Sequence, residues 1–373
     1  MKVAFLCSTP YQIFTAINIT CNHLTDSQVD VYVYDYFERS EEMVNSLKES
    51  GTFRNVNHCR FKEIHRKLVN GTAMSRIKNK IHYFLFHKAG TVGESGCGNE
   101  SYDTVFYSNQ DPVNEMMIRL FHRRNRFVSI CHFEDGWIDY TVRKHEFFGT
   151  RAQRSNWFWK TPKEYFERTV SWLYLPELAD SSVDPNSIRK IQSGGEKASA
   201  AINAVFGYSL ESRINTKVLY FDTLQENYLG GSMEQHLNTL QILSEMIDIK
   251  EITIKKHPRN FSKEYITHGY QIYSGLSVPF EVVCANQDFG KNLLISTFST
   301  ACFSPKVLFD QEPYVILTYK MLGYEAQMKE SIEQYICRIR NSYRNPERII
   351  IPEDRAQFEM EVEKCRKRWN GEL

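Results

Sequence analysis

The feature that most constrains this chain is a repeated alternation of short apolar runs with segments of helical periodicity. The first apolar run, Lys2–Cys7, is followed by a Ser-Thr-Pro break, a helix-period segment at Tyr11–Thr20, and a second apolar run at Val29–Tyr34. A strand, a helix and another strand in this order predict a parallel sheet with a right-handed crossover. The predicted fold class is therefore α/β.

The same rhythm continues along the chain in two halves. Further strands are predicted at 104–107, 126–133, 217–221, 251–255, 293–296 and 314–317. Helices are predicted at 38–50, 113–121, 233–246 and 352–369. With 373 residues, the chain is long enough for two cores. We therefore predict two Rossmann-like domains facing a central cleft, at residues 1–210 and 211–350, and a C-terminal helix at 351–373 that could cross back onto the first domain.

Composition excludes several classes of protein. The 46 Lys and Arg residues nearly balance the 45 Asp and Glu residues, whereas domains that bind nucleic acid are usually strongly basic. The nine cysteines form no CxxC pair, so neither a zinc site nor a disulfide framework is indicated, and a reducing cytoplasm is expected. No apolar run approaches the roughly 20 residues of a membrane-spanning helix.

Polar loops follow three predicted strands of the first half, at Ser8–Gln12, Ser108–Asp111 and Glu134–Gly136. In open α/β sheets ligands bind at the carboxyl ends of strands, so these loops predict one site. A carboxylate there could act as a general base, although the Glu-Asp-Gly tripeptide also suits a β-turn or a helix N-cap. The candidate residues from these loops are Thr9, Gln12, Asn109, Glu134 and Asp135.

The second half carries three further polar segments. His257 ends a predicted strand, with Lys256 before it and Pro258 after it, and could donate a proton to a departing phosphate oxygen. A structural histidine is the alternative. Ser299 and Thr300 follow another strand, where hydroxyl and N–H groups could bind an anion or simply cap a helix. A single acid, Glu281, follows a Pro-Phe turn.

In chain order, the acidic-Gly turn, the His-Pro pair, the Pro-Phe-Glu segment and the hydroxyl pair resemble motifs of a known superfamily. It is the bacterial sialyltransferase and polysialyltransferase superfamily, which has the GT-B architecture. The opening Leu6–Gln12 and the segment Phe298–Ala301 look most like glycosyltransferase family 52, the lipooligosaccharide sialyltransferase group. The resemblance covers residues 1–20, 104–140 and 217–305.

The resemblance implies a role for each matching residue. His257 would assist departure of CMP, Ser299 and Thr300 would bind its phosphate, and Glu281 would hold the nucleoside, with Lys256 and Pro258 beside them. The base would be Asp135, next to Glu134, or else an acid ahead of the His-Pro motif, Asp222 or Glu226. We prefer Asp135 because the strand ending at Phe133 places it at the sheet edge. Thr9, Gln12 and Asn109 would then lie on the acceptor side.

The implied reaction is an inverting, metal-independent transfer from CMP-sialic acid to a glycan of a bacterial surface polysaccharide, either capsule or lipooligosaccharide. No Asp-x-Asp triplet, which could hold a metal ion, follows a predicted strand, so neither a metal nor another cofactor is expected. The expected partners are the nucleotide-sugar donor and the glycan acceptor, without nucleic acid; a homodimer is compatible with the sequence. The basic, aromatic stretch Arg76–Lys88 and the tail Lys364–Trp369 could rest on anionic lipid at the inner face of the membrane.

Other functions remain open at this level. Polyol-phosphate transferases of wall teichoic acid synthesis share a His-Pro motif and hydroxyl pairs. Some proteins of family 52 use nucleotide-glucose donors, and a different CMP-sugar acid would fit the same motifs. A non-catalytic polysaccharide assembly protein could also retain the fold.

Overall fold

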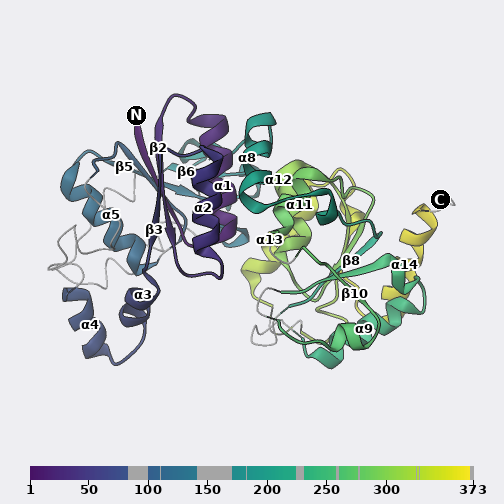
Figure 1. The fold of residues 1–373 in the computed structure, drawn as a ribbon. Helices are drawn as coiled ribbons and strands as arrows, with labels where there is room; N and C mark the ends of the chain where they lie inside the picture. Colours follow the sequence, from purple (N-terminus) through teal and green to yellow (C-terminus); the bar gives the residue numbers. More distant parts are fainter. Residues whose placement is uncertain are drawn as a thin grey trace. The chain divides into compact units, whose positions relative to one another are not determined.

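The computed structural model describes residues 1–82, 100–109, 111–140, 170–181, 183–223, 231–257, 260–275, 278–324, 326 and 328–369, apart from the side chains of residues 80 and 81. The chain divides into two compact units, Met1–Phe206 and Gly207–Leu373, coloured from purple to teal and from teal to yellow in Figure 1. The division lies four residues before the one expected at residue 210, and each unit has its own sheet.

The first unit is built on a parallel sheet of seven described strands in the order β3-β2-β1-β4-β5-β6-β7. Pairing is in register along β1 and β2, from Lys2 opposite Gln28 to Cys7 opposite Val33. The strands are β1 (Lys2–Cys7), β2 (Gln28–Tyr34), β3 (Asn55–Cys59), β4 (Thr104–Tyr107), β5 (Ser129–Phe133), β6 (Val170–Leu173) and β7 (Ile188–Lys190).

Helices cover both faces of this sheet. One face packs against α3 (Lys62–Val69) and α5 (Pro112–Arg124), and there Ala4 and Leu6 of β1 join a common apolar core. Val3, Phe5 and Cys7, which alternate with them along β1, are also buried, as expected for a strand covered on both sides. The other described helices of this unit are α1 (Pro10–His23), α2 (Ser40–Ser50), α4 (Ala73–Ile81) and α8 (Glu196–Phe206).

The second unit has a parallel sheet of six described strands in the order β10-β9-β8-β11-β12-β13. The strands are β8 (Val218–Phe221), β9 (Ile252–Lys255), β10 (Gln271–Ile272), β11 (Leu293–Ser296), β12 (Tyr314–Leu317) and β13 (Ile349–Ile350). The described helices are α9 (Met233–Ser244), α10 (Glu264–Thr267), α11 (Phe280–Asn286), α12 (Ser304–Phe309), α13 (Glu330–Ser342) and α14 (Arg355–Trp369).

The C-terminal helix α14 belongs to the second unit. Its buried residues Phe358, Val362 and Cys365 pack into the core formed by β8, β9, β11 and α9. From the sequence, this helix could cross back onto the first domain. In the structure its apolar stripe is buried in the core of the second unit. A second difference is β5, which begins at Ser129 and not at Arg126, because the exposed Phe127 lies in the turn before it.

A buried ion cluster ties α12 to the segment that follows it. Lys306 and Glu312 are 4% and 5% exposed, and Lys306 Nζ lies 2.8 Å from Glu312 Oε1. Arg344 Nε donates to the same oxygen over 3.1 Å. Burial would raise the pKa of Glu312, but the hydrogen bonds from Lys306 and Arg344 outweigh it and lower that pKa to about 2.

Glu312→Gln is therefore expected to lower the free energy of unfolding by about 3–5 kcal/mol near neutral pH, because it removes the buried carboxylate that pairs with Lys306 and leaves the exposed Asp310 as its remaining acidic partner. The folded-state pKa of Glu312 is depressed, so its contribution is present above the unfolded pKa and is lost as the pH falls towards 2. Urea unfolding at several pH values measures this. The exposed Glu347→Gln serves as the control, and a difference between wild type and Glu312→Gln that is constant at all pH values would contradict the account.

Candidate functional site

Both sheets reverse their strand order beside the first strand of the unit. In the first unit β2 and β3 lie on one side of β1, and β4 to β7 lie on the other. In the second unit β9 and β10 lie on one side of β8, and β11 to β13 lie on the other. Ligands of doubly wound sheets bind at the carboxyl ends of the strands next to such a reversal. The candidate binding segments are therefore the loops after β1, β4 and β5 in the first unit and those after β8, β9 and β11 in the second.

In the first unit these loops converge on Asp135. Thr9, which follows β1, donates from Oγ1 to Asp135 Oδ1 over 3.3 Å and caps α1 by accepting from Gln12 N. Ser8 N and Oγ both donate to Gln12 Oε1, and Asn109 Nδ2 donates to Ser8 Oγ over 3.4 Å. The structure thus brings together the acceptor-side candidates Thr9, Gln12 and Asn109 and the candidate base. Their roles stay a prediction.

Asp135 is tuned to titrate near neutral pH. Burial is the main cause, and the negative charge of Asp139 adds to it; together they raise the pKa of Asp135 from 3.8 to about 7. Hydrogen bonding to Gln12, Thr9 and Asn109 acts in the opposite direction. A carboxylate with a pKa near the working pH is suited to accept a proton from a substrate hydroxyl.

Glu134, the neighbouring candidate, is held differently. It is 1% exposed, and its carboxylate accepts hydrogen bonds from Tyr11 Oη at 2.9 Å, from Tyr174 N at 2.8 Å and from Tyr140 Oη. Burial raises its pKa to about 8 despite these donors. Both oxygens are engaged inside the unit, so this arrangement suits a structural acid that ties α1, β5 and β6 together.

Asp139 and His132 support the turn that contains Asp135, and neither is among the candidates predicted from the sequence. Asp139 accepts from the backbone N of Asp135 over 2.6 Å, and its other oxygen lies 3.1 Å from His132 Nε2. His132 Nε2 also lies 2.8 Å from the carbonyl oxygen of Ser108, which can only accept, so this nitrogen carries a proton. The pair fixes the turn containing Asp135 and joins it to the loop after β4. The acid four residues after Asp135 was the only sequence signal available.

In the second unit Asp222 follows β8 and is 3% exposed. It accepts hydrogen bonds from the backbone N of His257 and from Asn260 Nδ2. Burial raises its pKa to about 6, while the hydrogen bonds from His257 and Asn260 act against that rise. Asp222 therefore ties His257 and Asn260 to the end of β8. Glu226, the other alternative base, lies outside the described residues.

The loop after β9 contains two described candidates. His257 is partly buried, and its carbonyl oxygen accepts from Asn260 N over 2.8 Å, so both its backbone groups are fixed. Lys256 donates from Nζ to the carbonyl oxygen of Ser262 over 2.6 Å, which directs its charge onto its own loop. Pro258 lies outside the described residues.

Glu281, Ser299 and Thr300 belong to two linked segments. Glu281 lies in the first turn of α11 and accepts from Ser304 Oγ over 3.2 Å. Ser299 caps a 3₁₀ turn, Thr300–Phe303, by accepting from Ala301 N over 3.4 Å, which is the capping role considered for it. The hydroxyl-bearing segment and the acid of α11 are thus held together by Ser304.

Lys255, at the end of β9, adds a partly buried cation to this neighbourhood. Burial lowers its pKa, and the nearby charge of Glu281 acts against that effect. Its Nζ lies 5.1 Å from the ring centre of Tyr273. Lys255 therefore links the strand that carries the His257 loop to Glu281.

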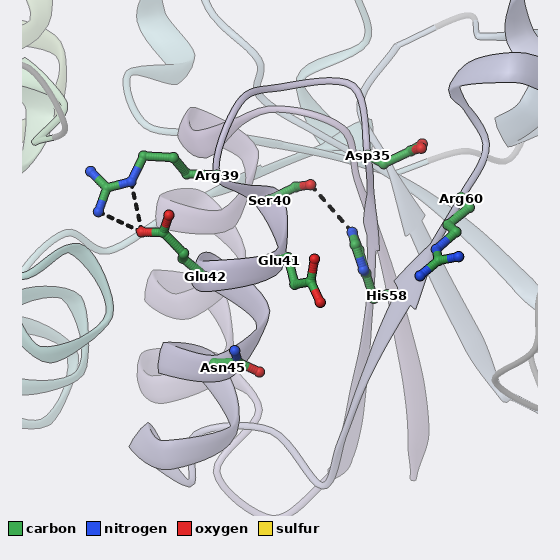
Figure 2. Close-up of a pocket in the computed structure, with 8 residues that line it drawn as sticks. All are labelled: Asp35, Arg39, Ser40, Glu41, Glu42, Asn45, His58 and Arg60. Atoms are coloured by element: carbon green, nitrogen blue, oxygen red, sulfur yellow. Dashed lines mark hydrogen bonds and ion pairs between the residues drawn. The ribbon is translucent and has the colours of Figure 1, made fainter.

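A surface hollow of about 580 Å³ lies at the ends of β2 and β3 and the start of α2. Figure 2 shows the residues that line it, which include the charged Asp35, Arg39, Glu41, Glu42 and Arg60. Ser40 Oγ lies 3.2 Å from His58 Nε2 inside it, and Arg39 pairs with Glu42 at its rim. The predicted site residues do not line it. Among the residues that the structure describes, no group of three or more His, Cys, Asp or Glu side chains could hold a metal ion, and no helix is long and apolar enough to cross a membrane.

Asp139→Asn is expected to lower the pKa of Asp135 towards its ordinary value, because it removes the negative charge that helps to raise it. Carboxyl ¹³C NMR titration of Asp135 measures this without any assay of activity. The exposed Asp26→Asn, in the same unit, should leave the titration unchanged. An Asp135 pKa that stays at about 7 in Asp139→Asn would show that burial alone sets it.

No protein-family model matches the chain, and no curated protein matches it in sequence. Solved structures do resemble it. The α/β-galactoside α-2,3-sialyltransferase of the luminous marine bacterium Photobacterium phosphoreum is 11% identical, with a TM-score of 0.55 over 94% of this chain and 98% of that one. The calicheamicin glycosyltransferase is 12% identical, with a TM-score of 0.52 over 98% and 89%. The glycotransferase of kitacinnamycin is 7% identical, with a TM-score of 0.51 over 98% and 90%.

At such low identity these likenesses concern the fold. Each covers nearly the whole of both chains, so each includes both units and their two parallel sheets. The chain has the GT-B type of α/β fold with two Rossmann-like units, which confirms the fold class predicted from the sequence.

Proposed function

We propose that this chain is an inverting, metal-independent glycosyltransferase that moves sialic acid from CMP-sialic acid to a hydroxyl of a glycan. The observation that carries the proposal is Asp135, a carboxylate with a pKa of about 7 at the carboxyl edge of the first sheet. The similarity of fold to a bacterial sialyltransferase supports the choice of donor. The assignment to family 52 rests on the sequence motifs alone and is part of the proposal.

The first unit supplies the base. Asp135 is ringed by side chains that hydrogen-bond through hydroxyl or amide groups, namely Thr9, Gln12 and Asn109. Such groups can also bind the hydroxyls of a sugar, and they favour the ionised form of the acid without neutralising it. Glu134 has its oxygens engaged with Tyr11, Tyr140 and Tyr174 and is not the base in this proposal.

The second unit supplies the leaving-group site. Asp222 accepts from the backbone N of His257, which fixes the position from which the imidazole is presented. Ser299 and Thr300 follow β11, next to β8 in the sheet, and can donate their hydroxyls to a phosphate. Asp222 itself is committed to backbone and amide donors, which argues for Asp135 as the base. None of these contacts excludes Glu226 as the alternative base.

The proposed reaction is a single displacement. The acceptor hydroxyl transfers its proton to the Asp135 carboxylate as its oxygen forms a bond to the anomeric carbon of sialic acid. The bond from that carbon to the phosphate oxygen breaks, and its electron pair leaves with CMP. Protonated His257 and the hydroxyls of Ser299 and Thr300 stabilise the negative charge that grows on the phosphate. Attack opposite to departure inverts the anomeric centre.

A panel of donors tests the proposal directly. Purified protein is incubated with a mixture of sialylable glycans and with CMP-sialic acid, another CMP-sugar acid, CDP-glycerol or UDP-glucose, and the release of nucleotide and the glycan products are measured. We expect transfer from CMP-sialic acid, unaffected by EDTA. Transfer from CDP-glycerol or UDP-glucose while CMP-sialic acid is inert would refute it.

His257→Ala separates catalysis from a scaffold role. Loss of a donor to the leaving group is expected to lower kcat about 10²–10⁴-fold. The exposed His268→Ala, which caps α10, provides a matched histidine control. Full complementation of the surface glycan by His257→Ala in cells would indicate a non-catalytic assembly protein.

Asp135→Asn is expected to lower kcat about 10²–10⁴-fold, with the fold retained. In the wild type, kcat should rise with pH through about 7 as Asp135 ionises, and this limb should vanish in the variant. The pH dependence of kcat measures both effects, with Asp26→Asn as the control. A wild-type rate that is flat between about pH 5 and 9 would assign the proton transfer to another group.

A further inference from the structure

The short helix α4 exposes apolar side chains that a helix packed on a core would bury. Its apolar residues Met74 and Ile77 are 76% and 53% exposed, and they lie three residues apart on one face. A helix that packs on a core normally buries such a stripe. Val69, at the end of the preceding helix α3, is also 43% exposed. Among the described side chains of α4, the partly buried ones are instead the polar Ser75 and Asn79.

Polar contacts hold α4 in this orientation. Asn79 Nδ2 donates to the carbonyl oxygen of Lys67 in α3 over 2.9 Å. Thr72 caps the helix by accepting from Ser75 N over 3.2 Å. Gly71 makes the turn between the helices with φ of 99°, where a side chain would be strained and would meet Ser75 Oγ. The exposed apolar stripe is therefore a consequence of specific contacts.

Positive charge surrounds the stripe. Residues 62–79 contain five Lys or Arg and one Glu, in a chain whose total net charge is +1. The single acid, Glu63, lies 3.0 Å from Arg66 and 3.7 Å from Lys67, whereas Arg76 and Lys78 flank Ile77 and are exposed. We call Val69, Met74 and Ile77, together with Arg66, Lys67, Arg76 and Lys78, the α3–α4 surface.

The α3–α4 surface is anchored at the carboxyl edge of the first sheet. Asp35, after β2, accepts from the backbone N of Phe61 and of Lys62 at the start of α3, each over 2.7 Å. His65 of α3 lies 3.4 Å from Asp111, which caps α5 just after the loop that contains Asn109. This is the edge at which Asp135 lies.

We propose that the α3–α4 surface docks the protein on a membrane containing anionic lipids, with Met74 and Ile77 entering the headgroup region and Arg76 and Lys78 contacting lipid phosphates. An exposed aliphatic stripe between cations matches the chemistry of an anionic bilayer surface, where apolar burial and attraction to charge act together. Docking presents the Asp135 edge of the first unit towards glycans carried by lipids. The docking itself does not depend on the proposed donor or reaction.

Other occupants fit this surface less well. A second copy would bring two surfaces of the same positive charge together, which is unfavourable. A nucleic acid would use the cations, but Val69, Met74 and Ile77 offer its bases no ring for stacking. An anionic membrane uses both properties.

Co-sedimentation with lipid vesicles tests the proposal on the full-length protein. Vesicles of phosphatidylglycerol and phosphatidylethanolamine are compared with vesicles of phosphatidylcholine, each at low and high salt. The wild type should bind the anionic vesicles, and less so at high salt. The double variant Arg76→Gln/Lys78→Gln should bind about 30-fold more weakly, from about 1 kcal/mol for each cation. Met74→Ser/Ile77→Ser should lose roughly tenfold or more.

The matched control is Leu210→Ser/Ile266→Ser, which removes two aliphatic side chains of 79% and 61% exposure from the second unit and should leave vesicle binding unchanged. Thermal unfolding of Met74→Ser/Ile77→Ser should match the wild type; a large destabilisation would mean that the stripe is covered within the chain, and would overturn the proposal. Equal binding of the wild type to both kinds of vesicle would also overturn it. So would a wild-type dimer in light scattering that Met74→Ser/Ile77→Ser abolishes, or tighter binding of the wild type to oligonucleotides than to anionic vesicles. The donor panel is unaffected by any of these outcomes.

Discussion

The removal of carboxylates from water at the ends of parallel strands is the constraint on which the structure of both sites depends. Parallel sheets covered by helices bury the carboxyl ends of their central strands, and an acid placed there loses hydration that only hydrogen-bond donors can replace. Asp135, Glu134 and Asp222 all occupy such positions, and burial is the main cause of the raised pKa of each. The donors around each acid then decide what it can do.

Glu134 and Asp222 have strong, internal donors. Three groups from three elements meet the oxygens of Glu134, and Asp222 accepts from a backbone N–H and an amide of the loop it supports. Asp135 interacts instead with hydroxyl and amide side chains, with Thr9 at 3.3 Å, and lies beside a second acid, Asp139, that helps to raise its pKa. The contacts of Asp135 leave it suited to exchange a proton with a substrate, whereas those of Glu134 and Asp222 join elements of their own units.

The near-zero net charge of the chain conceals a local asymmetry. The α3–α4 surface gathers cations and exposed aliphatic side chains, while elsewhere acids and bases pair, as in the buried Lys306–Glu312 cluster. Whole-chain composition argued correctly against a strongly basic protein but could not reveal this surface. Its existence depends on α4 turning its polar side towards α3, which a single hydrogen bond from Asn79 helps to impose.

Much of the fold was determined by the sequence itself. The apolar runs that became β1, β2, β4, β8, β11 and β12 were predicted because strands buried on both faces read as continuous apolar segments. The short or polar strands β3, β6, β7, β10 and β13 were not predicted, because their residues do not form an apolar run and they become strands only by pairing with a neighbouring strand. The convergence of Thr9, Gln12 and Asn109 on Asp135 followed from parallel strand order. The tertiary structure alone decided that Asp139 and His132 support that turn, that Asp222 holds His257, and that α14 stays with the second unit, because each depends on burial and on contacts between elements that local sequence does not specify.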